Sequence, residues 1–337
     1  MLGLRRRPAG GGEDRVPAGV QGRAGVRCAG GGLVTPDLAV SLGSLRLKNP
    51  VMSASGTFGY GLEFAPFYDI SRLGAIVVKG LSLAPAQGNP PGRIVETASG
   101  MLNAIGLQNI GVERFLADVA PRLSDAGATF AANIYGRTIE EYEAVAERLS
   151  GLASLAAIEV NASCPNVKEG GMAFGATPEG ISLLTGRVRR ATGKPLWVKL
   201  SPNVADIASI AAAAEDSGAD AVSLINTIVG MAVDHRTRRA RLANVTGGLS
   251  GPAIKPVALR MVWEVCRRVK IPVIGIGGIQ TASDALEFLL VGAQAVQVGT
   301  ANFRNPMACV EILEGIEAFL REERLHDIGD YRGKLLP

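Results

Sequence analysis

Eight short apolar segments alternate with stretches of helical periodicity through most of the chain. Each segment is four or five residues long and rich in Val, Ile, Leu or Ala, which is typical of parallel strands buried on both faces. The segments are residues 50–54, 75–78, 129–133, 156–160, 196–200, 221–225, 272–276 and 295–298. This alternation predicts an α/β fold, a closed (β/α)8 TIM barrel. An open doubly wound sheet is the alternative, but it would need fewer strands or an antiparallel edge.

Turn residues and breaks in periodicity predict how the barrel begins and where its connections are long. Two apolar runs flank Gly43 and predict a small N-terminal hairpin at the bottom of the barrel. A helix is predicted over residues 63–73. Residues 81–109 and 226–251 are interpreted as long loops, inserted at the face of the barrel where the strands end.

The composition is consistent with one large domain and excludes several kinds of partner. Of the 337 residues, 47% are hydrophobic, which is enough for the core of a single barrel. Residues 1–35 are rich in Gly, Arg and Ala without periodicity, so we interpret them as a disordered extension and residues 36–337 as a single domain. No basic stripe with interleaved aromatics and no long apolar run occurs, so neither nucleic-acid nor membrane binding is expected.

The cysteines and histidines argue against a metal centre. The four cysteines lie far apart, at Cys28, Cys164, Cys266 and Cys309. Because no two form a closely spaced pair, an iron–sulfur cluster or a zinc ribbon within this chain is not expected. The two histidines show no spacing with carboxylates that suggests a set of metal ligands. Free thiols are consistent with a reducing compartment, and we expect a cytoplasmic protein.

Polar side chains follow the predicted strands at their carboxyl ends. In a barrel these ends converge on one face, where active sites lie. The residues in question are Ser55, Lys79, Asn133, Asn161, Lys199, Asn226 and Thr227. Two lysines and several asparagines in one place indicate a binding pocket, because small or indifferent polar residues would otherwise be expected. Either lysine alone is also explained as a strand-end residue whose charge reaches solvent, but two inward charges need partners.

Glycines follow the last two predicted strands. Gly277 and Gly278 come after the seventh strand, and Gly299 precedes Thr300 after the eighth. Backbone amides free of side chains can hold a phosphate group there, and Gly251 offers a third close backbone approach. The phosphate could belong to a substrate or to a cofactor such as FMN. A lysine at the barrel mouth favours FMN, because it would stabilise the negative charge of a reduced flavin.

A cysteine follows the fourth predicted strand, in the segment AIEVNASCPNVKEGGMAFG. Cys164 lies between two asparagines just past the strand end, and the Gly170–Gly171 pair gives the loop the freedom of a lid. A thiol at this place is a candidate catalytic group. The alternative is a small buried hydrophobe, which is the commoner role of a free cysteine.

A second motif lies in the long loop after the second strand, and together the two motifs indicate a family. The stretch MLNAIGLQN, residues 101–109, offers amide donors and acceptors that match a planar pyrimidine. MLNAIGLQN and VNASCPNVKEGGMAFG resemble the class 1B dihydroorotate dehydrogenases. The likeness extends from about Asp37 to about Leu320, and five motifs agree in order and spacing. Ala162 departs from the family pattern, which has a branched residue there.

The resemblance implies specific roles for the strand-end residues. FMN would contact Ser55, Lys79, Gly80, Asn133, Asn161, Lys199, Ile225, Gly251, Gly277, Gly278, Gly299 and Thr300. Dihydroorotate would contact Lys79, Asn103, Ala104, Ile105, Gly106, Leu107, Asn161, Asn226 and Thr227. Cys164 would remove the C5 proton of dihydroorotate while the C6 hydride passes to FMN, and the product would be orotate.

The resemblance also implies a partner. Class 1B catalytic subunits pass electrons to NAD+ through a second subunit that carries FAD and a [2Fe-2S] cluster, in a heterotetramer with two copies of each chain. Three other functions remain open at this point. They are a class 1A-like enzyme that uses fumarate, a barrel similar to dihydropyrimidine dehydrogenase, and a non-catalytic barrel that binds flavin or phosphate.

Overall fold

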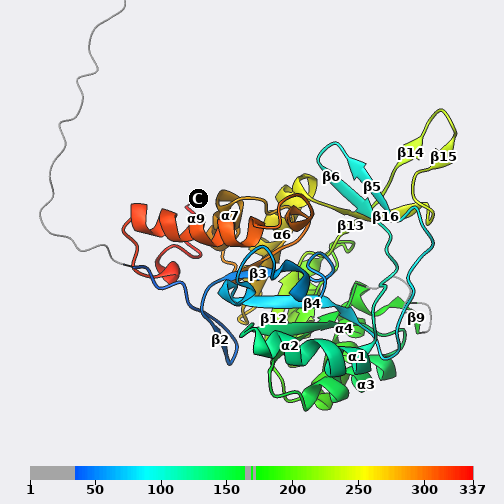
Figure 1. Cartoon of the computed structure of the whole chain (residues 1–337), viewed down its shortest axis with the longest axis horizontal. Helices are drawn as coiled ribbons and strands as arrows, with labels where there is room; N and C mark the ends of the chain where they lie inside the picture. Colours follow the sequence, from blue (N-terminus) through cyan, green and yellow to red (C-terminus); the bar gives the residue numbers. More distant parts are fainter. Residues whose placement is uncertain (1–34, 164–167, 170–171, 337) are drawn as a thin grey trace, which may run out of the picture. The chain divides into compact units, whose positions relative to one another are not determined.

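The centre of the structure, a computed structural model, is a closed barrel of eight parallel strands (Figure 1). The structure describes residues 35–163, 168–169 and 172–336. In chain order the barrel strands are β3 (Val51–Ser53), β4 (Ala75–Leu81), β7 (Phe130–Ile134), β8 (Leu155–Asn161), β11 (Leu196–Lys199), β12 (Ala221–Leu224), β17 (Val273–Ile276) and β18 (Ala295–Val298). Neighbours in the chain are neighbours in the barrel, and β18 pairs with β3 to close it. The predicted TIM barrel is therefore confirmed, and the open sheet is excluded.

Amphipathic helices follow the strands and surround the barrel, as the periodicity predicts. They are α3 (Ile139–Ser150), α4 (Pro178–Ala191), α5 (Ile207–Asp216), α6 (Lys255–Cys266), α7 (Ala282–Leu290), α8 (Ala301–Arg304) and α9 (Ala308–Glu322). A further helical stretch consists of α1 (Val112–Arg114), η3 (Phe115–Val119) and α2 (Ala120–Asp125). Side chains of Thr138, Thr177, Asp206 and Thr281 accept backbone N–H groups at helix starts, which satisfies donors that the helix leaves free.

The predicted helix over residues 63–73 is wrong. The structure has two short turns there, η1 (Leu62–Phe64) and η2 (Ile70–Arg72). Pro66 explains the break, because it has no backbone N–H to continue the hydrogen bonds of a helix that starts at Leu62. The Asp69 carboxylate then starts the second turn by accepting the N–H of Ser71 over 2.9 Å.

The two predicted long loops also contain strands that the sequence did not reveal. The strands β5 (Ile94–Thr97), β6 (Gly100–Asn103), β13 (Ile228–Met231) and β16 (Thr246–Ser250) form a four-stranded antiparallel sheet. A small ladder, β14 (Val233–Asp234) with β15 (Arg239–Ala240), extends from it (Figure 1). Val95, Leu102 and Leu242 form a separate small core beneath the sheet. The sheet joins the two loops, so each loop is shaped by the other.

The N-terminal hairpin lies where the sequence predicts it. Strands β1 (Val40–Leu42) and β2 (Leu45–Leu47) are antiparallel. Their turn at Gly43 lies beside Asp220, which precedes β12 and so marks the amino end of the barrel.

Residues 35–337 form one compact unit. Residues 1–34 are outside the described residues, so the disordered extension stays a prediction. None of the helices in the described part of the chain combines the length and apolarity needed to cross a bilayer.

The strand register determines which side chains point into the barrel. Side chains alternate along a strand, and residues paired in parallel register share a face. Lys199 pairs with Asn161 on β8 and with Ser223 on β12, and Asn133 on β7 pairs with Glu159. All five residues are more than 90% buried. The carboxyl half of the barrel interior is therefore polar, although the rest of the core is apolar.

Candidate active site

Three of the predicted site residues meet at the carboxyl ends of β8, β11 and β12. The Nδ2 of Asn226 donates to the Oδ1 of Asn161 over 3.2 Å. The backbone carbonyl of Asn161 accepts the hydroxyl of Tyr142 over 2.8 Å, which fixes the strand end. Lys199 lies beside Asn161 in register. The structure therefore brings Asn161, Asn226 and Lys199 together, as the sequence predicts.

Two polar groups that belong to largely buried residues of this region have no partner among the described residues. Lys199 is 6% exposed, and its ammonium makes no hydrogen bond or ion pair within the described part of the chain. Asn133 is 1% exposed and donates from Nδ2 to Glu159 over 2.7 Å, while no described residue donates to its Oδ1. A ligand with an anionic or acceptor group beside Lys199 would therefore gain a charge-assisted hydrogen bond.

The glycines after β16 and β17 lie close together and form a cradle of closely packed backbone. Gly251 and Gly278 have φ values of 93° and 73°, in the left-handed region that favours glycine. A Cβ on Gly278 would lie 2.7 Å from the Cβ of Lys255 and 3.0 Å from the carbonyl oxygen of Gly251. Gly277 lies beside Ile225, whose Cγ1 would be 3.4 Å from an added Cβ. Four predicted cofactor residues are thus neighbours, as binding of a single phosphate group would require.

The other predicted cofactor residues lie around the same mouth. Thr300, at the start of α8, donates from Oγ1 to the hydroxyl of Ser250 over 2.8 Å. Gly299 follows β18, and the neighbouring strand β3 leads into the partly exposed Ser55. Gly80 lies against Asn133, since an added Cβ would be 2.9 Å from its Oδ1. These residues and the glycine cradle fit the phosphate and polar ring of FMN.

Replacing Gly278 with alanine is expected to lower the free energy of unfolding by about 2–4 kcal/mol. The new methyl group would meet Lys255 and the backbone of Gly251, and the φ of 73° would be strained. Gly151→Ala is the matched control, because it has no positive φ and nothing lies within 4 Å of its added Cβ. Chemical denaturation of both variants measures the difference. Equal stabilities would contradict this description of the cradle.

The predicted substrate loop has a defined conformation in the structure. The Nδ2 of Asn103 donates to the carbonyl of Gly248 over 3.3 Å, and Thr227 packs against the same glycine. Leu107 has a φ of 56°, and its carbonyl accepts from the hydroxyl of Tyr135 over 2.9 Å. The loop is therefore anchored at both ends to elements around the barrel mouth.

The hydrogen bonds inside this loop show which backbone groups remain for a ligand. The backbone N–H of Ala104 donates to the carbonyl of Arg93 over 2.7 Å, and the carbonyl of Ile105 accepts the backbone N–H of Asn89 over 2.9 Å. The free donors are a run of four consecutive backbone N–H groups, for which no described residue is an acceptor. They belong to Ile105, Gly106, Leu107 and Gln108. Consecutive free N–H groups favour a ligand with carbonyl or carboxylate oxygens.

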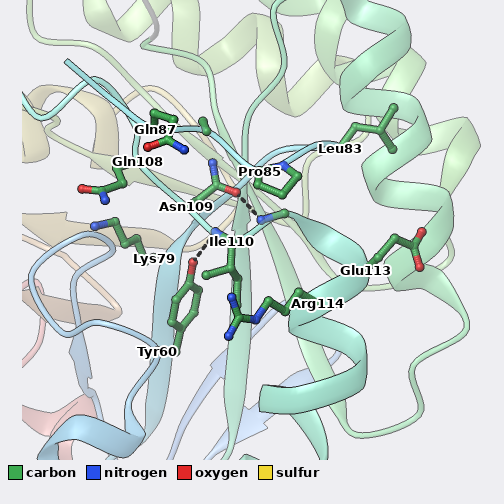
Figure 2. Close-up of a pocket in the computed structure, with 12 residues that line it drawn as sticks. Tyr60, Lys79, Leu83, Pro85, Gln87, Gln108, Asn109, Ile110, Glu113 and Arg114 are labelled. Carbon is green, nitrogen blue, oxygen red and sulfur yellow. Dashed lines mark hydrogen bonds between the residues drawn. The ribbon is translucent and has the colours of Figure 1, made fainter. Parts of the chain in front are cut away.

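A cavity of about 590 Å³ lies beside the substrate loop (Figure 2). Its lining includes Tyr60, Lys79 and Gln108, and the side chains of Lys79 and Gln108 extend to the same side of it in Figure 2. Burial lowers the pKa of Lys79, and the charge of Arg93 adds to this effect while Glu63 opposes it. The volume suits a small ligand, and Lys79 supplies a cation for an anionic group.

The predicted catalytic residue, Cys164, lies outside the described residues, so its role stays a prediction. Two other cysteines are described, and burial raises the pKa of Cys266 and of Cys309 to about 12. Both thiols are protonated near neutral pH and cannot serve as bases. The described residues also contain no cluster of three or more His, Cys, Asp or Glu that could hold a metal ion.

Two residues of the site were missed in the sequence. Glu159 is fully buried and accepts hydrogen bonds from three side chains inside the barrel. A charged residue within an apolar strand run was a visible signal for it. Tyr135 follows β7 and anchors the substrate loop. No sequence pattern marks that role, because it depends on a loop that approaches from elsewhere.

Comparisons with known proteins agree on one family. A family model described as dihydroorotate dehydrogenase matches residues 37–320. Three similar proteins are each named dihydroorotate dehydrogenase B (NAD(+)), catalytic subunit. The protein of Geotalea uraniireducens is 56% identical over 301 residues, covering 89% of this chain and 99% of the relative. That of Trichlorobacter lovleyi is 58% identical over 300 residues, with 89% and 99% covered. That of Solidesulfovibrio magneticus is 58% identical over 300 residues, with 89% and 98% covered.

Proposed function

The chain belongs to the dihydroorotate dehydrogenase family, and from that premise we propose that it is the catalytic subunit of an NAD+-dependent dihydroorotate dehydrogenase. It would oxidise dihydroorotate to orotate in pyrimidine biosynthesis. The relatives that carry this name are matched over nearly their whole length. One observation carries the proposal. Lys199, a largely buried residue whose ammonium has no described partner, lies at the same barrel mouth as the glycine cradle.

FMN is the cofactor of this proposal, and it would supply an acceptor for the hydride from C6 of the substrate. The backbone of Gly277, Gly278 and Gly299 would hold its phosphate. Lys199 would lie near the part of the ring that gains negative charge, where an ammonium group favours reduction. The Oδ1 of Asn133 would accept a hydrogen bond from the ring.

The substrate would be held by the loop and by the ends of β4 and β12. Lys79 would pair with the carboxylate, and the free N–H groups after Ala104 would donate to its oxygens. Asn226 and Thr227 would fix the ring, so that C5 faces Cys164 and C6 faces the flavin. Cys164 would take the proton from C5 as general base. The thiolate is the active form, so its pKa must lie well below those of Cys266 and Cys309.

The affinity for dihydroorotate is expected to fall as the pH rises, and to start falling below the ordinary lysine pKa of 10.5. The substrate carboxylate keeps its charge, whereas Lys79 loses its proton at a pKa that burial lowers. The alkaline limb of a kcat/KM profile measures this. Lys79→Met should remove the limb and lower kcat/KM by about 10–100-fold. Glu63→Gln should move the limb to lower pH, because Glu63 raises the pKa of Lys79. An unmoved limb in both variants would exclude Lys79 from substrate binding.

Electrons must leave the flavin, and we propose that they reach NAD+ through a second chain with FAD and a [2Fe-2S] cluster, in a heterotetramer in the cytoplasm. Two observations support a partner. The similar proteins are named as catalytic subunits. Ile94, Val229 and Met231, on the four-stranded sheet, are each more than half exposed and supply an apolar surface for association.

Assays with different acceptors test this function. The purified chain, loaded with FMN, is supplied with dihydroorotate and either fumarate or NAD+, with and without the electron-transfer subunit. The proposal expects NAD+ reduction only when both subunits are present. Rapid turnover with fumarate by the chain alone would identify a fumarate-dependent enzyme instead.

A further inference from the structure

The polar side chains inside the barrel are organised around one carboxylate. Glu159 on β8 is fully buried and accepts three hydrogen bonds. Asn133 donates to its Oε1 over 2.7 Å, and the hydroxyl of Ser223 and the Nε2 of Gln297 each donate to its Oε2 over 2.8 Å. The donors belong to three other strands, β7, β12 and β18. Within the described part of the chain, no cation forms an ion pair with Glu159, so neutral donors alone satisfy it.

Both side-chain oxygens of Glu159 accept hydrogen bonds, and such acceptors determine how neighbouring amides are turned. Gln297 directs its Nε2 to Glu159 even though its own Oε1 is then buried without a partner. Asn133 likewise directs its Nδ2 to Glu159. Its Oδ1 consequently faces Gly80, at the predicted cofactor site, and no described residue donates to it.

We propose that Glu159 is a positioning residue that orients the carboxamide of Asn133, so that the cofactor meets a hydrogen-bond acceptor there and not a donor. The inference rests on the proposed function, because the ligand of Oδ1 is the FMN of that proposal. A glutamine at position 159 could donate as well as accept. The carboxamide of Asn133 could then rotate by half a turn and direct its NH2 group at a donor of the FMN ring. Two buried donors would then face each other.

Titration of the FMN-free protein with FMN, followed by flavin fluorescence, tests this inference. Glu159→Gln is expected to weaken FMN binding by about tenfold or more. The double variant Glu159→Gln/Asn133→Asp should bind within about threefold of wild type. In that variant the amide introduced at position 159 donates to the carboxylate introduced at position 133. The second oxygen of this carboxylate again presents an acceptor to FMN. The number of buried carboxylates is also unchanged.

Ser223→Ala is the matched control. It removes a donor to the same carboxylate without touching Asn133, so it should lower the Tm and leave the Kd for FMN unchanged. A merely structural role of Glu159 would instead lower the Tm in Glu159→Gln while FMN affinity stayed at the wild-type level, and this result would overturn the inference.

Two further outcomes are also decisive. If Glu159→Gln shows no cooperative thermal transition, the double variant is compared with Asn133→Asp alone. Tighter FMN binding by the double variant supports the orienting role, and equal or weaker binding overturns it. If the wild-type chain itself binds no FMN, the proposed function fails, and that result is distinct from any difference between variants.

Discussion

Replacing Cys164 with alanine is expected to lower kcat by about 10²–10⁴-fold, the usual contribution of a general base, while FMN and orotate still bind. The thiolate would remove the C5 proton, and no other group among the described cysteines can replace it. Burial holds the pKa of Cys266 and of Cys309 at about 12, so both stay protonated. Steady-state kinetics give kcat, and titration with orotate gives the binding constant.

Cys266→Ala is the control for this experiment. Cys266 lies at the end of α6 beside Gly292, which precedes β18 at the amino end of the barrel, so its loss should leave kcat unchanged. Wild-type turnover by Cys164→Ala would remove Cys164 from the mechanism. A parallel loss of orotate binding would assign it a binding role in place of proton transfer.

Replacing Lys199 with methionine is expected to change two measurements in opposite directions. FMN affinity should fall by about 10–100-fold, because a charge-assisted hydrogen bond is lost. The Tm of the FMN-free protein should rise, because Lys199 as a residue is only 6% exposed and its ammonium has no partner among the described residues. Methionine has a similar length, so packing is largely kept.

Lys194→Met is the matched control for Lys199. Lys194 precedes β11 at the opposite end of the barrel, and its ammonium donates to the carbonyl of Leu155 over 3.0 Å. Its replacement should leave FMN affinity unchanged and should not raise the Tm. Normal flavin content together with normal flavin reduction kinetics in Lys199→Met would refute the role given to Lys199.

The barrel itself could be predicted from the sequence because its signals are local. Each strand is a short apolar run, and several helices begin at a capping residue such as Thr177 or Thr281. The alternation of strands and helices that the sequence predicts is the one that the structure has. The strand ends converge as barrel topology requires, so the positions of Asn161 and Lys199 followed from the same reasoning.

The antiparallel sheet over the barrel could not be predicted in the same way. Its strands come from two loops more than a hundred residues apart, and β16 contains Gly247 and Gly248, which weaken any strand signal. Asn103 pairs with Gly248 across this sheet. The conformation of the substrate loop therefore depends on a long-range contact that no local pattern records.

Hydrogen-bond direction was a second property that the sequence could not supply. Asn133 was expected at the cofactor site, but only the structure shows that Glu159 uses its donor. The same holds for Tyr135, whose hydroxyl anchors Leu107. Residue types identify the candidates, whereas their partners determine which chemical face each one presents.

Anaerobic mixing with dihydroorotate tests the central claim most directly. The FMN-loaded chain alone, without a partner subunit, is mixed with the substrate while the visible absorbance of the flavin is followed. We expect the flavin to be bleached, with one orotate formed for each flavin reduced. A colourless purified protein that takes up no FMN, or a flavin that keeps its absorbance with excess dihydroorotate, would contradict the account.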